Sequence, residues 1–142
     1  MIVKSRPGRP VEILLVEDNP ADVRMTQEAL KAAGVRHHLH VVEDGSDAIA
    51  FLYHEGRFFG VPRPDLVLLD LNIPKVGGHD VLLEIKSNDR LKHIPVVVLT
   101  SSKFERDIRK SYQWNADYFV NKPAGLEAFA AEIRIVETLA AR

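Results

Sequence analysis

Residues 65–74 read Asp-Leu-Val-Leu-Leu-Asp-Leu-Asn-Ile-Pro, and this stretch decides the fold of the chain. The unbroken apolar run from Leu66 to Leu69 lies between turn-forming residues, a pattern typical of a strand buried on both faces of a parallel sheet. The run ends on the carboxylate of Asp70. Ligands of open α/β sheets bind at the carboxyl ends of the strands. Asp70 is therefore either a helix cap or a functional carboxylate. The residues that follow the other predicted strands decide between these two roles.

The composition indicates one globular domain without a strong electrostatic preference. The chain has 142 residues, of which 46% are hydrophobic and 27% charged, and its net charge is −1. This balance gives no general attraction to nucleic acid or to an anionic membrane. The chain has no cysteine, which excludes disulfides and Cys-ligated zinc and fits a cytoplasmic location. No apolar run approaches the roughly 20 residues that span a bilayer.

The chain is expected to form a flexible N-terminal arm (residues 1–10) followed by one domain (residues 11–142). The arm is basic but lacks the apolar core of a signal peptide. The last expected helix ends close to the last residue, so we expect no separate DNA-binding domain.

Strands and helices are predicted to alternate along the domain. Each connection is long enough for a right-handed crossover between parallel strands. The prediction is a five-stranded, parallel, doubly wound sheet of flavodoxin-like type with five helices and strand order 2-1-3-4-5. The second strand is more polar, which places it nearer an edge. The expected strands are 11–16, 38–42, 66–70, 94–99 and 117–121; the expected helices run from Pro20 to Gly34, from after Gly45 to near Gly56, from Val81 to about Asn88, through Phe104 to Tyr112, and from Leu126 to Val136.

Polar residues follow the carboxyl end of every predicted strand. The three most apolar strands end at Asp18, Asp70 and Thr100, and should lie at the centre of the sheet. Glu17, Asp18 and Asp70 are therefore expected to converge. The full set of residues at the strand ends is Glu17-Asp18, Glu43-Asp44, Asp70, Thr100-Ser101 and Lys122-Pro123.

This set of side chains suits phosphoryl transfer assisted by Mg²⁺. Clustered carboxylates repel one another, and a hard divalent cation with oxygen ligands relieves that repulsion. A carboxylate can attack phosphorus while the metal and the Lys122 ammonium neutralise the phosphoryl oxygens and the Thr100 hydroxyl donates a hydrogen bond. Asp70 is the best nucleophile because it is the single acid at the end of the central strand.

With these residues the chain resembles the response-regulator receiver domains of two-component signalling, over about residues 11 to 139. The resemblance implies that a histidine kinase phosphorylates Asp70 and that Mg²⁺ is held by Glu17, Asp18, Asp70 and the backbone carbonyl of Asn72. It also implies contact of Lys122 with the phosphoryl oxygens, a Thr100–Phe119 switch, a cis Lys122–Pro123 bond, and output through the face of the fourth helix, last strand and last helix. The matching residues are Glu17, Asp18, Asp70, Gly78, Thr100, Phe119, Lys122 and Pro123.

A narrower resemblance points to the small regulators paired with bacterial phytochromes. It rests on the segments Val-Glu-Asp-Asn-Pro-Ala-Asp-Val-Arg (16–24) and Arg-Phe-Phe-Gly-Val-Pro-Arg-Pro (57–64), and on the residues around Asp70 and Thr100. That subgroup usually has glycine where Asn115 stands, and Asn tolerates the same left-handed backbone. These motifs also occur in regulators of other sensor kinases, so a phosphate sink in a different system is an alternative.

Aromatic residues are dense in and near the predicted fourth helix. A helix has one inward stripe, and Trp114 lies off the stripe formed by Phe104, Ile108 and Tyr112. We therefore expect part of this set to form a homodimer or partner surface.

Three further features have a structural and a functional interpretation. His38 and His40 share one face of a strand beside His37, but no acidic or cysteine ligand is evident near them, so a solvated strand face is favoured over a metal site. Glu43-Asp44 is most simply a turn with a helix cap. Phe58 and Phe59 are expected to cover the core, with exposure of one of them to a partner as the alternative.

Three other functions on a similar sheet are alternatives to the receiver. A Mg²⁺-dependent phosphohydrolase or a Toprim-like nuclease typically has Asp-x-Asp, but the second acidic position is Asn72, so no general acid is present. A flavin carrier needs a phosphate loop after the first strand, where Glu17-Asp18 would repel phosphate. We therefore expect a phosphoacceptor signalling protein rather than an enzyme acting on a separate substrate.

Overall fold

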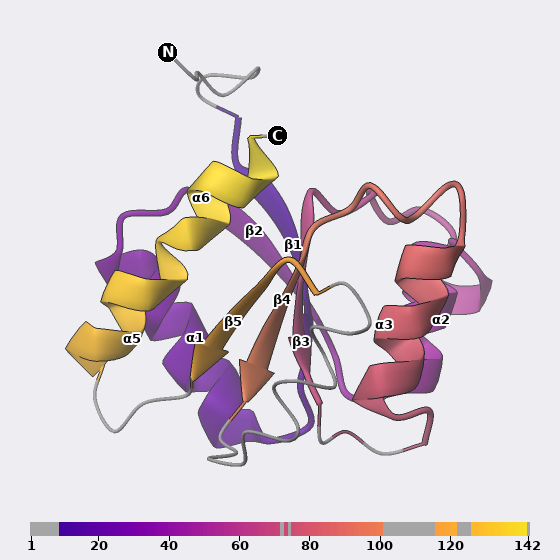
Figure 1. Cartoon of the computed structure of the whole chain (residues 1–142), viewed down its shortest axis with the longest axis horizontal. Helices are drawn as coiled ribbons and strands as arrows, with labels where there is room; N and C mark the ends of the chain where they lie inside the picture. The colour runs from indigo at the N-terminus through magenta and orange to yellow at the C-terminus, as the bar shows by residue number, and fades with distance from the viewer. Residues whose placement is uncertain (1–8, 72, 74, 101–115, 122–125, 142) are drawn as a thin grey trace.

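A computed structural model describes residues 9–71, 73, 75–100, 116–121 and 126–141, without the side chains of Thr100 and Asn121. Its five strands are parallel and ordered β2-β1-β3-β4-β5, which confirms the predicted sheet (Figure 1). The described elements are β1 (Val11–Val16), α1 (Pro20–Ala32), β2 (His37–Val42), α2 (Gly45–Leu52), the 3-10 helix η1 (Gly56–Phe58), β3 (Leu66–Asp70), α3 (Gly78–Ser87), β4 (Val96–Thr100), β5 (Tyr118–Asn121), α5 (Leu126–Ile133) and α6 (Ile135–Ala140).

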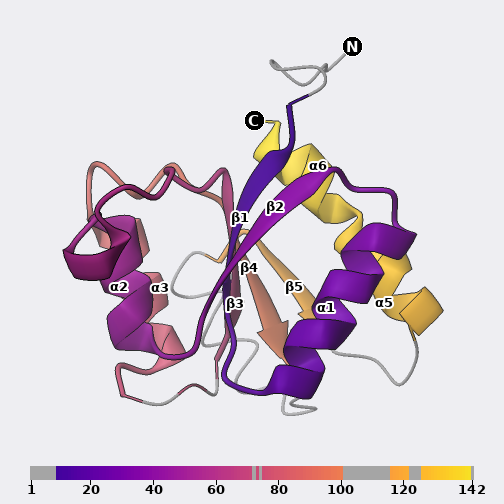
Figure 2. The same cartoon turned by 180° about the vertical axis from the view of Figure 1, so that it is seen from behind.

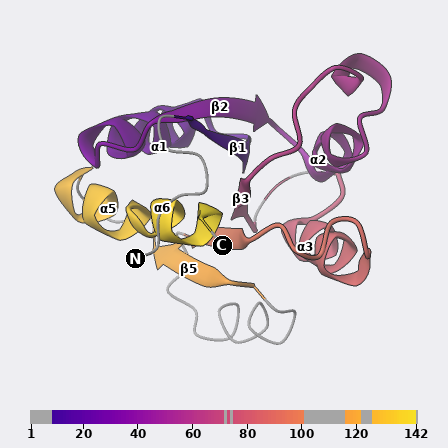
Figure 3. The same cartoon turned by 90° about the horizontal axis from the view of Figure 1, so that it is seen from above.

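The described helices cover both faces of the sheet. Helices α1, α5 and α6 lie on one side and α2 and α3 on the other, as Figures 2 and 3 show from behind and from above. Alternate residues of β1 supply the two cores: Ile13 and Leu15 pack toward α1 and α5, whereas Leu14 and Val16 pack toward α2 and α3. All four are fully buried.

Strand β3 occupies the centre of the sheet, as its apolar run predicts. Its residues Leu66 to Leu69 have no exposed surface, and Asp70 at its end is 7% exposed. Strand β2 lies at an edge, and all of its residues except the buried Val42 are partly buried or exposed, in agreement with its polar sequence. The central position of β3 brings Asp70 between the ends of β1 and β4.

Helix α1 begins and ends as its sequence predicts. The Asn19 side chain accepts hydrogen bonds from the backbone N–H groups of Ala21 and Asp22, at 2.9 and 3.3 Å, and Pro20 occupies the first helical position. Gly34 follows the helix with a φ of +75°, a conformation that glycine adopts without strain.

Several predicted boundaries are wrong. Helix α3 begins at Gly78, three residues before the expected start at Val81. Helix α2 ends at Leu52, before the expected end near Gly56, and Gly56 begins the separate 3-10 helix η1. Strand β4 begins at Val96, two residues later than expected, because the preceding Pro95 has no N–H to donate to a neighbouring strand. The single helix expected at the end of the chain is two helices, α5 and α6, separated at Arg134.

Several sequence predictions lie outside the described residues. They concern most of the N-terminal arm, the fourth helix and the bond between Lys122 and Pro123. Within the part of the chain that the structure covers, no helix is long and apolar enough to cross a membrane.

Removal of buried volume from β3 should destabilise the fold strongly. Leu68 is fully buried, whereas Leu83 on α3 is 50% exposed. We expect Leu68→Ala to lower the free energy of unfolding by about 2–5 kcal/mol, because it leaves a cavity between packed layers. Leu83→Ala is the matched control and should cost under about 1 kcal/mol. Urea denaturation measures both, and equal losses would contradict the assigned core.

Candidate functional site

Three carboxylates meet at the carboxyl edge of the sheet. One oxygen each from Glu17, Asp18 and Asp70 lies within 4.8 Å of the others. Glu17 is fully buried and Asp70 nearly so, whereas Asp18 is exposed to solvent. The convergence predicted from the strand ends is therefore confirmed, and the group is open on the side of Asp18.

The strand register brings these acids together. Val16 at the end of β1 pairs with Leu69 of β3, so the next residues, Glu17 and Asp70, lie beside each other at the end of the sheet. The Glu17 N–H donates to the carbonyl of Val42 at 2.9 Å and continues the pairing with β2. Its carboxylate accepts a hydrogen bond from the backbone N–H of Asn19 at 3.3 Å, which orients it at the start of α1.

The donor set fits a hard divalent cation. All three side chains offer carboxylate oxygens, and Mg²⁺ and Mn²⁺ prefer such ligands. The buried acids provide fixed ligands, while exposed Asp18 leaves room for water and for a phosphoryl group. The arrangement can hold a metal ion directly beside a potential nucleophile, Asp70.

The loop after Asp70 is held by close backbone contacts at both ends. A Cβ atom on Gly78 would lie 2.5 Å from the Cα of Leu71 and 2.7 Å from the Asp70 carbonyl oxygen, so only glycine fits there. A Cβ on Gly45, the first residue of α2, would lie 1.8 Å from the carbonyl oxygen of Val76. The start of α2 therefore packs directly on the loop that follows the candidate nucleophile.

An ion pair fastens the same loop. The Asp44 carboxylate caps α2 by accepting the Asp47 N–H at 2.7 Å, and its other oxygen lies 3.4 Å from the Lys75 Nζ. The cap predicted at Asp44 is thus confirmed, and its contact with Lys75 was not foreseen. The Asp47 N–H lowers the pKa of Asp44; burial opposes this, but the Lys75 ammonium and the Ser46 N–H add to the lowering. Asp44 is therefore held in its charged form.

The remaining predicted site residues are only partly described. Thr100 ends β4, directly paired with Asn121 at the end of β5, which places its backbone at the same sheet edge as Asp70. Phe119 is half-buried against the core on the α3 side, as expected for either a packing or a switch residue. Asn72, Asn115, Lys122 and the residues Phe104, Ile108, Tyr112 and Trp114 lie outside the described residues.

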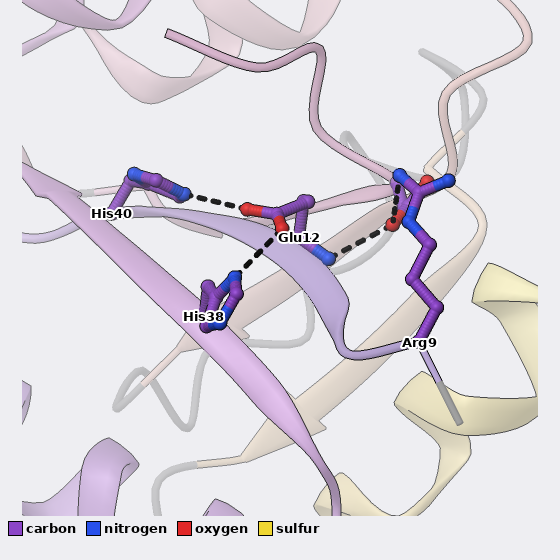
Figure 4. A network of polar contacts seen from close by, with 5 residues as sticks. Arg9, Glu12, His38 and His40 are labelled. Atoms are coloured by element: carbon purple, nitrogen blue, oxygen red, sulfur yellow. Dashed lines mark hydrogen bonds and ion pairs between the residues drawn. The ribbon is translucent and has the colours of Figure 1, made fainter.

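Sequence reasoning missed an acidic partner of two histidines. The Glu12 carboxylate accepts hydrogen bonds from His38 Nδ1 and His40 Nε2, both at 2.8 Å (Figure 4). The expectation that no acidic side chain lies near this pair is therefore wrong. Glu12 faces them from another strand, 26 residues from His38, and only the predicted pairing of β1 with β2 could have indicated it.

The two adjacent phenylalanines take different environments. Phe58 packs against the core beside Phe51, with ring centroids 5.4 Å apart. Phe59 is 84% exposed. The expectation of core cover is therefore right for Phe58 and wrong for Phe59.

The sequence and the fold match known proteins closely. Residues 13–134 match the family described as the response regulator receiver domain. The response regulator Rcp1 of Synechocystis sp. is 45% identical over 129 residues, which cover 91% of this chain and 88% of Rcp1. The phosphorylated cyanobacterial phytochrome response regulator RcpA aligns with a TM-score of 0.82 at 46% identity, covering 91% of this chain and 92% of RcpA. The Mn²⁺-bound form of Rcp1 aligns with a TM-score of 0.80 at 45% identity, covering 91% and 93%.

Insertion of a methyl group at Gly45 should disturb the loop after Asp70. The new Cβ would collide with the backbone of Val76, which cannot move without shifting the loop. We expect Gly45→Ala to lower the free energy of unfolding by about 1–3 kcal/mol. Gly60→Ala is the control, because no atom lies within 4 Å of its added Cβ. Urea denaturation compares the two, and a Gly45→Ala variant as stable as Gly60→Ala would contradict the contact.

The charge on Asp44 should give a pH-dependent share of stability. Its folded-state pKa is lowered, so its contribution is complete above the unfolded pKa of about 3.9 and is lost as pH falls through the folded-state value. Asparagine can still cap α2. We therefore expect the stability difference between wild type and Asp44→Asn to be constant above about pH 5 and to shrink below about pH 4. Lys75→Met should reduce this pH dependence in part. If the stability difference between wild type and Asp44→Asn did not change with pH, the lowered pKa of Asp44 would be contradicted.

Proposed function

Because the chain belongs to the response regulator receiver domain family, we propose that it accepts a phosphoryl group on Asp70 from a sensor histidine kinase and signals through protein contacts. The observation that carries the proposal is the convergence of Glu17, Asp18 and Asp70 at one edge of the sheet. The family match favours this phosphoacceptor role over a phosphohydrolase on a similar sheet. A cytoplasmic location is part of the same proposal.

In the proposed reaction, a carboxylate oxygen of Asp70 attacks the phosphorus of a phosphohistidine. The bond from phosphorus to the histidine nitrogen breaks, and an aspartyl phosphate forms. The carboxyl groups of Glu17 and Asp18 lie beside the acceptor. Because Asp70 and the incoming phosphoryl group are both anionic, the transfer needs a positive counter-charge. Lys122 is proposed to contact the phosphoryl oxygens and Thr100 to donate a hydrogen bond to them.

Mg²⁺ is the proposed cofactor, held by Glu17, Asp18, Asp70 and the backbone carbonyl of Asn72. When bound, the ion would neutralise charge on the phosphoryl oxygens and align them for transfer. The oxygen-only donor set of the three described acids supports this choice. The Mn²⁺-bound structure of Rcp1, at 45% identity, is consistent with a divalent ion in a related protein.

The output is proposed to pass through Thr100 and Phe119 to the surface formed by residues 104–114, β5 and α5. Phosphorylation would bias an existing equilibrium of this surface rather than create a new state. Phe119 lies half-buried on β5, at the sheet edge. Tyr118 and Leu126, which belong to β5 and α5, are 38% and 43% exposed and leave apolar area for a partner.

We propose two partners for this surface and site. The first is a phytochrome-type histidine kinase, supported by the similarity to RcpA, which is a phytochrome response regulator. The second is another copy of the chain, in a homodimer that uses Phe104, Ile108, Tyr112 and Trp114.

Phosphorylation from a small phosphodonor tests the acceptor. With acetyl phosphate and Mg²⁺, we expect the wild type to form a phosphoprotein that hydroxylamine cleaves, as an acyl phosphate requires. Asp70→Asn should remove the label, because an amide cannot form this bond. Asp89→Asn is the matched control, since that side chain is 94% exposed in a turn far along the chain from the site. Label that persists in Asp70→Asn, or no label in the wild type, would refute the mechanism.

A further inference from the structure

The Glu12 carboxylate lies between two imidazole rings near the amino end of β1 (Figure 4). Its Oε2 atom lies 2.8 Å from His38 Nδ1 and its Oε1 atom 2.8 Å from His40 Nε2. Glu12 and His38 are register partners in neighbouring parallel strands, and His40 shares the face of His38 two residues further on. The sheet thus places two imidazoles beside one carboxylate, each hydrogen-bonded to a different oxygen of Glu12.

This cluster is oriented by its surroundings and open to solvent. The backbone N–H of Glu12 donates to Asp65 Oδ2 at 2.8 Å, and Arg9 lies 3.9 Å from the same oxygen. The His40 ring packs against Phe51 with centroids 5.5 Å apart. The exposed fractions of the Glu12, His40 and His38 side chains are 12%, 28% and 61%, so the cluster is fixed on one side and accessible on the other.

The donor chemistry differs from that of the phosphoacceptor edge. Imidazole nitrogen is a borderline ligand that suits Zn²⁺, Ni²⁺ and Cu²⁺, whereas an all-carboxylate set suits Mg²⁺ and Mn²⁺. Two histidines and one glutamate form a familiar set of three protein ligands for Zn²⁺, with further positions left for water. We propose that Glu12, His38 and His40 form a second metal site, selective for a late first-row transition-metal ion such as Zn²⁺.

Binding requires a rearrangement of the hydrogen-bonded cluster, because its three ligand atoms do not all lie within 4.8 Å of one another. Around a tetrahedral ion with bonds of about 2.0–2.2 Å, neighbouring ligand atoms lie about 3.3 Å apart. Each nitrogen–oxygen pair therefore has to open by about half an ångström, and the two rings have to turn toward each other. Among the described residues only Glu17, Asp18 and Asp70 already hold three ligand atoms within 4.8 Å. The solvent-exposed ring of His38 has the freedom to make this turn.

The second site is independent of the phosphoacceptor site. Glu17 lies five positions after Glu12, just past the end of β1, which corresponds to about 16 Å at about 3.3 Å per residue. The two sites therefore share no ligand. The proposal does not rest on phosphorylation of Asp70.

Titration of Zn²⁺ into the full-length Asp18→Asn variant, with excess Mg²⁺ present, tests the site by calorimetry. This background weakens competing metal binding at the carboxyl edge. We expect one equivalent of Zn²⁺ to bind. His38→Ala, His40→Ala and Glu12→Gln should each weaken binding at least about tenfold.

His93→Ala is the matched control, because His93 is exposed and belongs to the turn between α3 and β4, outside the cluster. It should leave the affinity unchanged. Two-dimensional NMR of the imidazole groups gives a second measurement, in which Zn²⁺ should shift His38 and His40 and leave His93 unaffected. If His40→Ala fails to fold, the His38→Ala and Glu12→Gln variants still test the site. Binding weaker than about 1 mM, or equal affinity in His38→Ala and His93→Ala, would show that the histidines only hydrogen-bond to Glu12.

Discussion

The parallel pairing of β1 with β3 is the constraint on which the site depends. Because Val16, the last residue of β1, lies opposite Leu69, the following residues Glu17 and Asp70 are brought side by side. Both strands are fully buried through their apolar runs, so neither can slip by one residue without turning its side chains to the opposite layer. The hydrophobic packing of the two cores therefore sets the positions of the carboxylates. The free energy gained by that packing has to offset the mutual repulsion of the carboxylates.

Close backbone contacts connect this edge to the α2 side of the sheet. Gly45 and Gly78 leave no space for a Cβ atom, so the loop after Asp70 rests directly on the start of α2 and on the end of β3. The ion pair between Asp44 and Lys75 adds an electrostatic contact between this loop and the start of α2. Loops at a functional edge are usually the most mobile part of an α/β domain. Here Leu71 lies against Gly78, and Lys75 and Val76 contact the start of α2, so described residues of this loop are held in place.

The carboxyl end of the sheet and the cluster near the amino end of β1 offer ligands of different chemical softness. The carboxyl edge presents oxygen atoms alone, whereas the cluster near the amino end of β1 combines one carboxylate with two imidazoles. Burial raises the pKa of Glu12, but the hydrogen bonds and charges of His40 and His38 outweigh it and hold this pKa below its usual value. The same strand, β1, thus carries a charged carboxylate near its start and an acidic pair just after its end. Softness of the donors, rather than position alone, would separate the ions bound at each edge.

The sequence by itself determined the fold class, the strand order and the convergence of Glu17, Asp18 and Asp70, because apolar runs and the residues after them are local patterns. Local patterns were weaker at boundaries: they did not indicate the break at Arg134 or the early end of α2. Only the tertiary structure decided that Glu12 meets His38 and that Lys75 meets Asp44, since these pairs are 26 and 31 positions apart. A single sequence records which side chains are present, whereas strand register and loop contacts determine which of them meet.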